Sequence, residues 1–177
     1  MSRPPRIRGF SYLGNYRYFV TFCTFDRRDV FSDHAIAQAV VSQFRRTCRR
    51  KKFAILAYCL MPDHVHLLVE GMSDTADFRR FIKSLKQSSG QACSSRVRGA
   101  GPAMRRVPSH RGPARRRCPL WQEGYYDRVL RADDDAKAVA RYIVENPVRA
   151  GLVRSPSDYP LVGSDLWTLD ELIESFR

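Results

Sequence analysis

The chain has 177 residues, enough for one domain with a buried core, and its 44% hydrophobic and 28% charged residues are typical of a globular rather than a disordered protein. It carries 31 Lys and Arg against 18 Asp and Glu, a formal net charge of +13, which favours nucleic acid as partner over charge that serves only solubility. No apolar run approaches the ~18 residues of a transmembrane helix, and the first residues lack the apolar core of a signal peptide, so we expect no membrane partner.

A strand and then a helix are predicted at the start of the chain. Residues 16–24 are rich in β-branched and aromatic residues, which favour a strand. Ser32 or Asp33 can cap the following helix, whose apolar residues recur at helical spacing up to Phe44. This helix ends in a basic cluster, where cations suit the helix dipole, so part of the charge has a structural explanation.

A hairpin carrying two histidines is predicted next. Residues 53–60 and 64–70 read as strands, and Pro62-Asp63 makes a tight connection between them. Because side chains alternate along a strand, His64 and His66 point to one face, while the apolar residues between and after them point into a core. Two neighbouring imidazoles form half of a metal site. On spacing alone, the alternative is two histidines that are hydrogen-bonded or solvated.

A second helix and a basic segment follow. The helix is predicted to open at Ser73 or Asp74 with cations on its outer face. From about residue 94 to 118 the apolar period is lost, and we expect a flexible basic insertion. The arginines of this insertion lie in a segment without the apolar residues of a core. They either bind DNA phosphates or form a solvent-exposed basic segment without a functional role. The candidate nucleic-acid-binding residues are Arg79, Lys83, Arg115, Arg116 and Arg117.

One more strand and one more helix complete the pattern. Residues 121–130 read as a strand, and three aspartates at 133–135 start a helix that runs to Asn146, where Pro147 ends or kinks it. Tyr142 and Asn146 are four residues apart and share one face of this helix. The side chains of Tyr142 and Asn146 could lie next to a metal ion that is bound by the two histidines. The alternative is a packed tyrosine and an asparagine that caps the helix C-terminus.

The order strand, helix, strand, strand, helix, strand, helix predicts an α+β fold. A split βαβ pattern of this kind gives the ferredoxin-like arrangement, an antiparallel sheet with helices on one face, followed here by a C-terminal helix that carries the tyrosine. The open face of the sheet could receive a polyanion. RNA-recognition domains share this plan, but the third predicted strand lacks their aromatic RNP1 signature. Five cysteines without CxxC spacing predict a reduced cytoplasmic protein.

Three separated motifs together resemble one family. They are His64-Val65-His66, which looks like an HUH motif, the segment WQEGYYD at 121–127, and the segment YIVENPVRAGL at 142–152. In this order they resemble the REP-associated tyrosine transposases, relatives of the IS200-like single-strand transposases. The resemblance covers about residues 10–165, which predicts one HUH transposase domain there, with the insertion at about 94–118, and a C-terminal tail at 166–177. The arginine-rich insertion departs from the family pattern, as does Arg128, which stands where many members have histidine.

The resemblance implies an enzyme that cleaves and rejoins single-stranded DNA at hairpin-forming repeats. His64 and His66 would bind Mg²⁺ or Mn²⁺ with Asn146 as third ligand. Tyr142 would be the nucleophile, leaving a 5′-phosphotyrosine link and a free 3′-OH. It also implies a bacterial, nucleoid-associated protein in the cytoplasm, working as a monomer or a homodimer.

Two other functions remain open at this stage. One is a nucleic-acid-binding module that has lost catalysis and uses the sheet face and the basic insertion. The other is a metal-dependent phosphoesterase that uses water instead of tyrosine. Tyr125 and Tyr126 are rival nucleophiles by residue type, although their place in a strand pattern favours sheet packing or base stacking.

Overall fold

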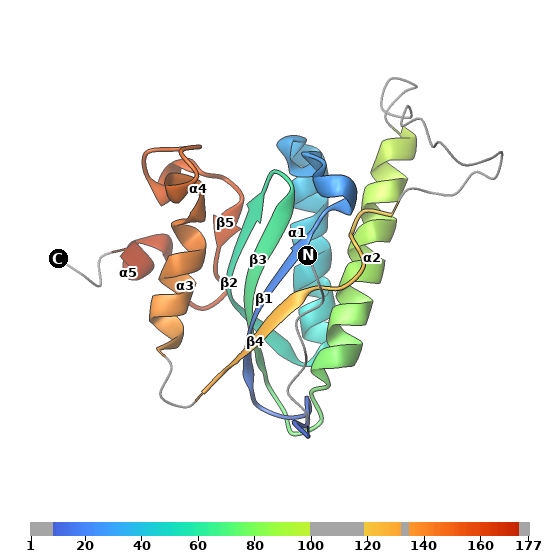
Figure 1. Ribbon diagram of the computed structural model, residues 1–177, viewed down its shortest axis with the longest axis vertical. Helices are drawn as coiled ribbons and strands as arrows, with labels where there is room; N and C mark the ends of the chain where they lie inside the picture. Colours follow the sequence, from blue (N-terminus) through green and yellow to red (C-terminus); the bar gives the residue numbers. More distant parts are fainter. Residues whose placement is uncertain (1–8, 100–118, 132–134, 174–177) are drawn as a thin grey trace.

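An antiparallel sheet forms the centre of the computed structural model, which describes residues 9–99, 119–131 and 135–173 (Figure 1). Its strands lie in the spatial order β4-β1-β3-β2-β5. Without β5 this is the ferredoxin-like order, so the predicted fold class is confirmed. The strands are β1 (Arg17–Cys23), β2 (Phe53–Met61), β3 (His64–Gly71), β4 (Tyr126–Leu130) and β5 (Val162–Gly163).

Helices lie on both faces of this sheet, so the second face is not fully open as the sequence predicted. The helices α1 (His34–Lys51) and α2 (Phe78–Gly99) pack together on one face, whereas α3 (Ala136–Val144) packs on β2 and β3 from the other (Figure 1). Two short helices, α4 (Asn146–Arg149) and α5 (Leu169–Ile173), lie beside α3. The remaining helices are short 3₁₀ turns, η1 (Phe25–Arg27), η2 (Val30–Ser32) and η4 (Pro156–Asp158).

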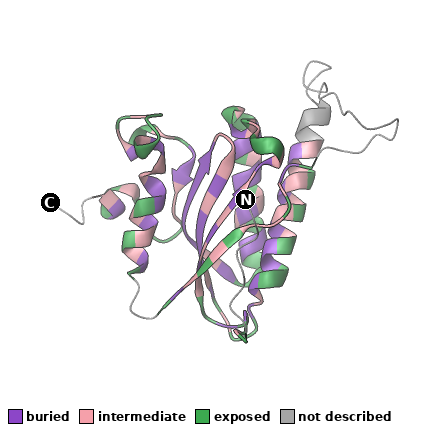
Figure 2. Cartoon of the chain, in the orientation of Figure 1, coloured by how far each residue is buried: buried purple, intermediate pink, exposed green. Residues whose placement is uncertain are grey.

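Alternation along the strands divides the buried side chains into two cores. Figure 2 shows buried residues along the strands and on the helices that flank the sheet. Val65, Leu67 and Val69 of β3 are fully buried against the α1–α2 layer, as the sequence predicted. The opposite face of the same strands packs on Ile143 and Val144 of α3. His64 and His66 alternate along β3 with the residues of the first core. Their side chains therefore point to the opposite face of the sheet, which α3 partly covers.

The second helix begins later and ends later than the sequence predicts. Ser73 and Asp74 lie in a turn, and α2 begins at Phe78, with Asp77 accepting a hydrogen bond from the Arg80 amide at 2.9 Å. The backbone of Asp77 is held extended by a bridge to Leu13, which delays the helix by one turn. At the other end, α2 continues to Gly99, five residues beyond the start of the predicted insertion. Residues 100–118 lie outside the described residues.

Among the other elements, β4 begins at Tyr126 rather than at residue 121, because Trp121 forms only an isolated bridge to Thr24, and α3 ends at Val144 rather than at Asn146. Asp33 caps α1, accepting hydrogen bonds from the amides of Ala35 and Ile36 at 2.9 and 3.1 Å. The helix is interrupted at Glu145, and α4 begins directly after it with Pro147 in its first turn, where a missing N–H is tolerated. The strand β5, two residues that pair with β2, was not predicted from the sequence. No helix in the described ranges is long and apolar enough to cross a membrane.

Candidate active site at the histidine face

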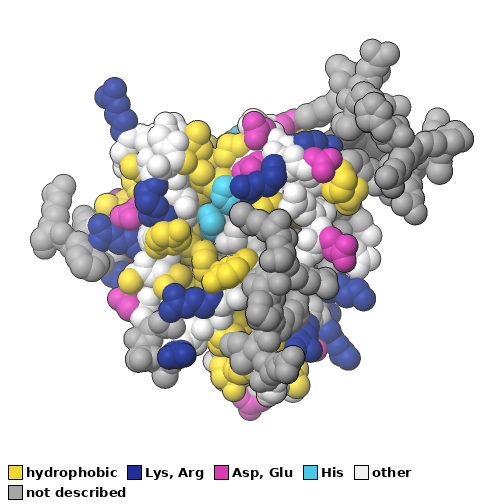
Figure 3. All heavy atoms as spheres, viewed as in Figure 1, with side chains coloured by type: hydrophobic (Ala, Val, Ile, Leu, Met, Phe, Trp, Pro, Cys, Tyr) yellow, Lys and Arg dark blue, Asp and Glu magenta, His cyan; other side chains and the backbone are white. Residues whose placement is uncertain are grey.

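The two histidines of β3 converge on one point. Their Nε2 atoms lie 3.1 Å apart, and their rings stand at 90° to each other. Both side chains reach the surface, where hydrophobic and basic side chains gather around them (Figure 3). The prediction that His64 and His66 leave one face of the sheet side by side is confirmed by this geometry.

The other nitrogen of each imidazole is held by a neighbour. His64 Nδ1 donates to the Asp63 carboxylate at 2.5 Å, and His66 Nδ1 is hydrogen-bonded to Thr21 Oγ1 at 2.9 Å. Thr21 pairs directly with His66 across β1 and β3, so the bond follows from the strand register. Outer partners of this kind orient imidazoles in metal sites and leave Nε2 to face the ion.

Burial keeps His66 neutral at physiological pH. The pKa of His66 is lowered to about 4, first by burial and then by the positive charges of His64, Arg149 and Arg27. A neutral imidazole has a free lone pair, so His66 can bind a cation without first releasing a proton.

A strained turn holds Asp63 in place. Asp26 and Arg27 have positive φ values of 56° and 54°, which side chains with a Cβ rarely adopt. This conformation places Arg27 Nε 3.1 Å from Asp63 Oδ2. The backbone amide of Thr24, a fully buried residue, also donates to the carbonyl oxygen of Asp63 at 2.9 Å. The end of β1 therefore fixes the hairpin turn that carries His64.

Helix α3 brings Tyr142 to the same face. Asp135 caps the helix by accepting a hydrogen bond from the Lys137 amide at 2.8 Å. Tyr142 lies beside the buried stripe of α3 and is 50% exposed. Its ring centroid lies 6.3 Å from that of Phe19, which in turn lies 5.8 Å from His66. Phe19 thus links the tyrosine to the histidine pair through two ring contacts.

Asn146 lies where the chain turns from α3 into α4. Its Nδ2 donates to the carbonyl oxygens of Tyr142 and Ile143, both at 3.1 Å. These bonds cap the end of α3, so the predicted alternative of an asparagine that caps the helix C-terminus is confirmed. They also turn the amide so that Oδ1, the atom a cation would bind, is not used for the cap. The capping role and the predicted metal role are therefore compatible.

The rival tyrosines, Tyr125 just before β4 and Tyr126 at its start, lie on opposite sides of the sheet. Tyr125 packs against Phe78 in the first core, with ring centroids 6.2 Å apart. Tyr126 is 47% exposed and lies 6.4 Å from Phe19 on the histidine side. Arg128 pairs with Phe19 across β1 and β4 and is exposed on this side too.

The predicted phosphate-binding residues lie elsewhere or outside the described chain. Arg79 and Lys83 are exposed on α2, the helix that covers the opposite face of the sheet, and the Arg79 guanidinium lies 4.7 Å from the centre of the Tyr12 ring. The structure does not bring these two cations to the histidines. Arg115, Arg116 and Arg117 lie outside the described residues.

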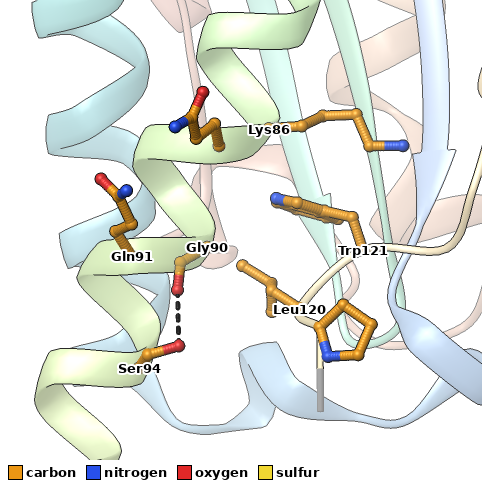
Figure 4. Close-up of a pocket in the computed structure, with 8 residues that line it drawn as sticks. Lys86, Gly90, Gln91, Ser94, Leu120 and Trp121 are labelled. Atoms are coloured by element: carbon orange, nitrogen blue, oxygen red, sulfur yellow. Dashed lines mark hydrogen bonds between the residues drawn. The ribbon is translucent and has the colours of Figure 1, made fainter. Parts of the chain in front are cut away.

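A hollow beside α2 is separate from this face. Figure 4 shows Lys86, Gly90, Gln91 and Ser94 of α2 on one side and Leu120 and Trp121 on the other. None of the described residues that line it is a predicted site residue. Trp121 donates from Nε1 to Ser89 Oγ at 2.9 Å and packs on Phe22, so its role here is structural.

The two imidazoles fit a divalent cation. Two cis ligands at about 2.1 Å in an octahedral shell lie about 3 Å apart, close to the 3.1 Å between the Nε2 atoms. Within the described ranges, no cluster of three His, Cys, Asp or Glu side chains could complete the shell. Among the described residues, a further ligand would be a group of another kind, such as an amide oxygen.

The sequence did not assign a site role to four of these residues. Phe19, Thr21 and Arg27 reach the histidines only through strand register and a positive-φ turn, which local patterns do not encode. Asp63 was read as a turn residue. Its position directly before the first histidine was the available signal, because metal-binding histidines commonly donate to a carboxylate.

The chain is similar to known proteins in sequence and in fold. Residues 12–146 match the family model described as "Transposase IS200 like". A Haemophilus influenzae protein described as "Putative REP-associated tyrosine transposase" is 26% identical over 156 residues, covering 84% of each chain. A solved structure, "Structure of the REP associates tyrosine transposase bound to a REP hairpin", matches with a TM-score of 0.65 and 20% identity, covering 89% of this chain and 81% of that one. With its family model matched over most of its length, the chain belongs to the IS200-like transposase family.

Proposed function

We propose that this protein is a REP-associated tyrosine transposase that cleaves and rejoins single-stranded DNA at hairpin-forming repeats through Tyr142. The observation that carries the proposal is the convergence of the His64 and His66 Nε2 atoms beside an exposed tyrosine from another element. Family membership makes DNA the substrate class. The similar solved protein is bound to a REP hairpin, which supports the same kind of target for this chain.

In the proposed site, His64 and His66 hold Mg²⁺ or Mn²⁺ and Asn146 Oδ1 supplies a third ligand. When bound, the cation supplies positive charge that offsets the charge developing on the scissile phosphate. Asp63 and Thr21 hold the two Nδ1 atoms, which leaves the two Nε2 atoms facing each other. Since the pKa of His66 is already low, this imidazole accepts the ion without proton release.

Tyr142 performs the bond exchange. Its phenolic oxygen forms a bond to phosphorus and loses its proton, while the bond from phosphorus to the 3′-oxygen breaks and that oxygen gains a proton. The DNA is left with a 5′-phosphotyrosine link and a free 3′-OH. Attack by a 3′-OH on this link reverses the step and joins a new end. The large exposed fraction of Tyr142 supports this role, because a packed tyrosine could not reach a phosphate.

Formation of a covalent adduct tests the proposal. The full chain would be mixed with a labelled single-stranded oligonucleotide carrying a repeat hairpin from beside its gene, with Mg²⁺ or with EDTA. We expect an SDS-stable protein–DNA adduct that needs the metal, disappears in Tyr142→Phe and persists in Tyr126→Phe. Binding without an adduct would instead indicate a non-catalytic module, and cleavage without an adduct would indicate a phosphoesterase that uses water.

A further inference from the structure

Arg149 lies directly over the ring of Tyr142. It is the last residue of α4, and its guanidinium carbon is 4.0 Å from the centre of the tyrosine ring. Its Nη2 also donates to the carbonyl oxygen of Tyr142 at 2.5 Å. Glu145, the residue between α3 and α4, keeps helical backbone angles, so Arg149 lies about two turns beyond Tyr142 on nearly the same face, and its side chain reaches back over the ring.

The rest of the guanidinium is held loosely. Nη1 lies 3.4 Å from Glu145 Oε2, but the closer partner of Glu145 is Arg141, at 2.7 Å from Oε1. The Arg149 side chain is 40% exposed. A planar guanidinium can stack on an aromatic ring with its face while its edge donates to an anion. Nη1 can therefore turn to a phosphate without loss of the stacking contact.

The surroundings place this cation beside the histidines. Helix α4 packs on β2, the strand that pairs with β3 at His66. Phe19 contacts both Tyr142 and His66. A phosphate that lies within reach of Tyr142 and the two imidazoles would thus meet the edge of Arg149.

We propose that Arg149 is a phosphate-binding residue of the active site, which binds one non-bridging oxygen of the scissile phosphate while it stays stacked on the Tyr142 ring. The inference rests on the proposed function, since it assumes that Tyr142 is the nucleophile. A purely structural Arg149 would cap α3 through the Tyr142 carbonyl and touch no substrate.

A substrate change separates these two roles. Single-turnover adduct formation at saturating DNA would be measured with the hairpin oligonucleotide and with the same oligonucleotide carrying a methylphosphonate at the scissile position, in each stereoisomer. Replacing one non-bridging oxygen by methyl removes the group that Arg149 would bind. The variants are Arg149→Gln, Arg149→Lys and, as a matched control, Arg154→Gln, which removes an exposed charge five residues away.

On normal DNA we expect Arg149→Gln to slow adduct formation by about 10- to 100-fold, the usual effect of losing a charge-assisted hydrogen bond. Arg149→Lys should recover part of this loss, and Arg154→Gln should match the wild type. With one methylphosphonate stereoisomer, Arg149→Gln and wild type should react at equal rates, because the two changes remove the same contact.

Equal slowing of Arg149→Gln on the normal and both modified substrates would overturn the inference and leave only a structural role. An unchanged rate on normal DNA would overturn it as well, while the adduct itself would still support the proposed function. Absence of any adduct in the wild type would instead refute the proposed function, and the assignment of Arg149 with it.

Discussion

Burial and hydrogen bonding position His66 before any ligand arrives. Its Nδ1 is bonded to Thr21, its ring stacks on Phe19, and its pKa is lowered to about 4 by burial and nearby positive charge. His64 is held by Asp63 in the same manner. A site organised in this way loses little entropy when it binds a cation.

The first prediction concerns the cation itself. The double variant His64→Ala/His66→Ala should abolish Mn²⁺ binding measured by calorimetry, since it removes both imidazoles. Asn146→Ala should weaken binding less, because water can replace an amide oxygen. His34→Ala, which removes an exposed histidine from the start of α1, is the control. Unchanged Mn²⁺ affinity in the double variant would exclude the histidine pair as the metal site.

The second prediction concerns the carboxylate behind His64. Asp63→Ala removes the acceptor of His64 Nδ1 and the partner of Arg27, so Mn²⁺ affinity should fall by about 10- to 100-fold. Asp74→Ala removes an exposed carboxylate from the turn before α2 and should leave the affinity unchanged. Equal affinities in the two variants would show that Asp63 serves only the turn.

At the scale of elements, the sequence predicted what depends on local pattern. The strands β1 to β3, the cap of α1 and the shared face of the two histidines follow from alternation and capping, and the structure confirms them. The start of α2 could not be predicted this way, because the bridge from Leu13 to Asp77 joins residues 64 positions apart. The strand β5 was missed for the same reason, since only its pairing with β2 makes it a strand.

The residues of the candidate site can also be divided into those that local sequence pattern predicts and those that it does not. Residue types and spacing pointed to His64, His66, Tyr142 and Asn146, and the structure places the first three on one face. The residues that orient them come from other strands and turns. Thr21 and Phe19 reach His66 through β1, and Arg149 reaches the Tyr142 ring from the following helix α4. Such contacts depend on register and chain direction, which a single sequence does not display.

The third prediction tests how the hairpin is held at its far end. Gly71 ends β3, and a Cβ there would collide with the carbonyl oxygen of Gly14. Because that obstacle is backbone, Gly71→Ala should lower the free energy of unfolding by about 1–3 kcal/mol. Urea denaturation would measure the loss. Gly90→Ala, in the middle of α2 where a Cβ meets nothing closer than 3.9 Å, should not destabilise the protein and serves as control.

At the scale of the whole molecule, the charge of +13 predicts binding to DNA that depends strongly on salt. Part of this charge stabilises helix ends, as at Arg49, Arg50 and Lys51 in the last turn of α1. The candidate phosphate-binding residues on α2 lie on the other side of the sheet from the histidines. A hairpin that used both regions would therefore have to extend around the edge of the sheet.

The fourth prediction concerns the basic insertion. Replacing Arg115, Arg116 and Arg117 by Gln should weaken binding of single-stranded DNA and flatten the slope of log K against log salt by up to about 2 units, because each phosphate contact contributes about −0.7. Adduct formation in the saturated complex should be nearly unchanged. A variant in which Arg49, Arg50 and Lys51 are replaced by Gln loses the same number of charges and provides the control. If the insertion variant had the same DNA affinity and the same salt slope as the wild type, the three arginines would be solvent-exposed residues that do not bind DNA.

Mass spectrometry of the adduct shows directly which tyrosine forms the covalent bond to DNA. After nuclease and protease digestion, we expect a peptide containing Tyr142 that carries a nucleotide through its 5′-phosphate, with a free 3′-OH on the released strand. A nucleotide attached to the peptide containing Tyr125 and Tyr126, or a link to a 3′-phosphate, would show that Tyr142 is not the nucleophile or that the polarity of the link is wrong.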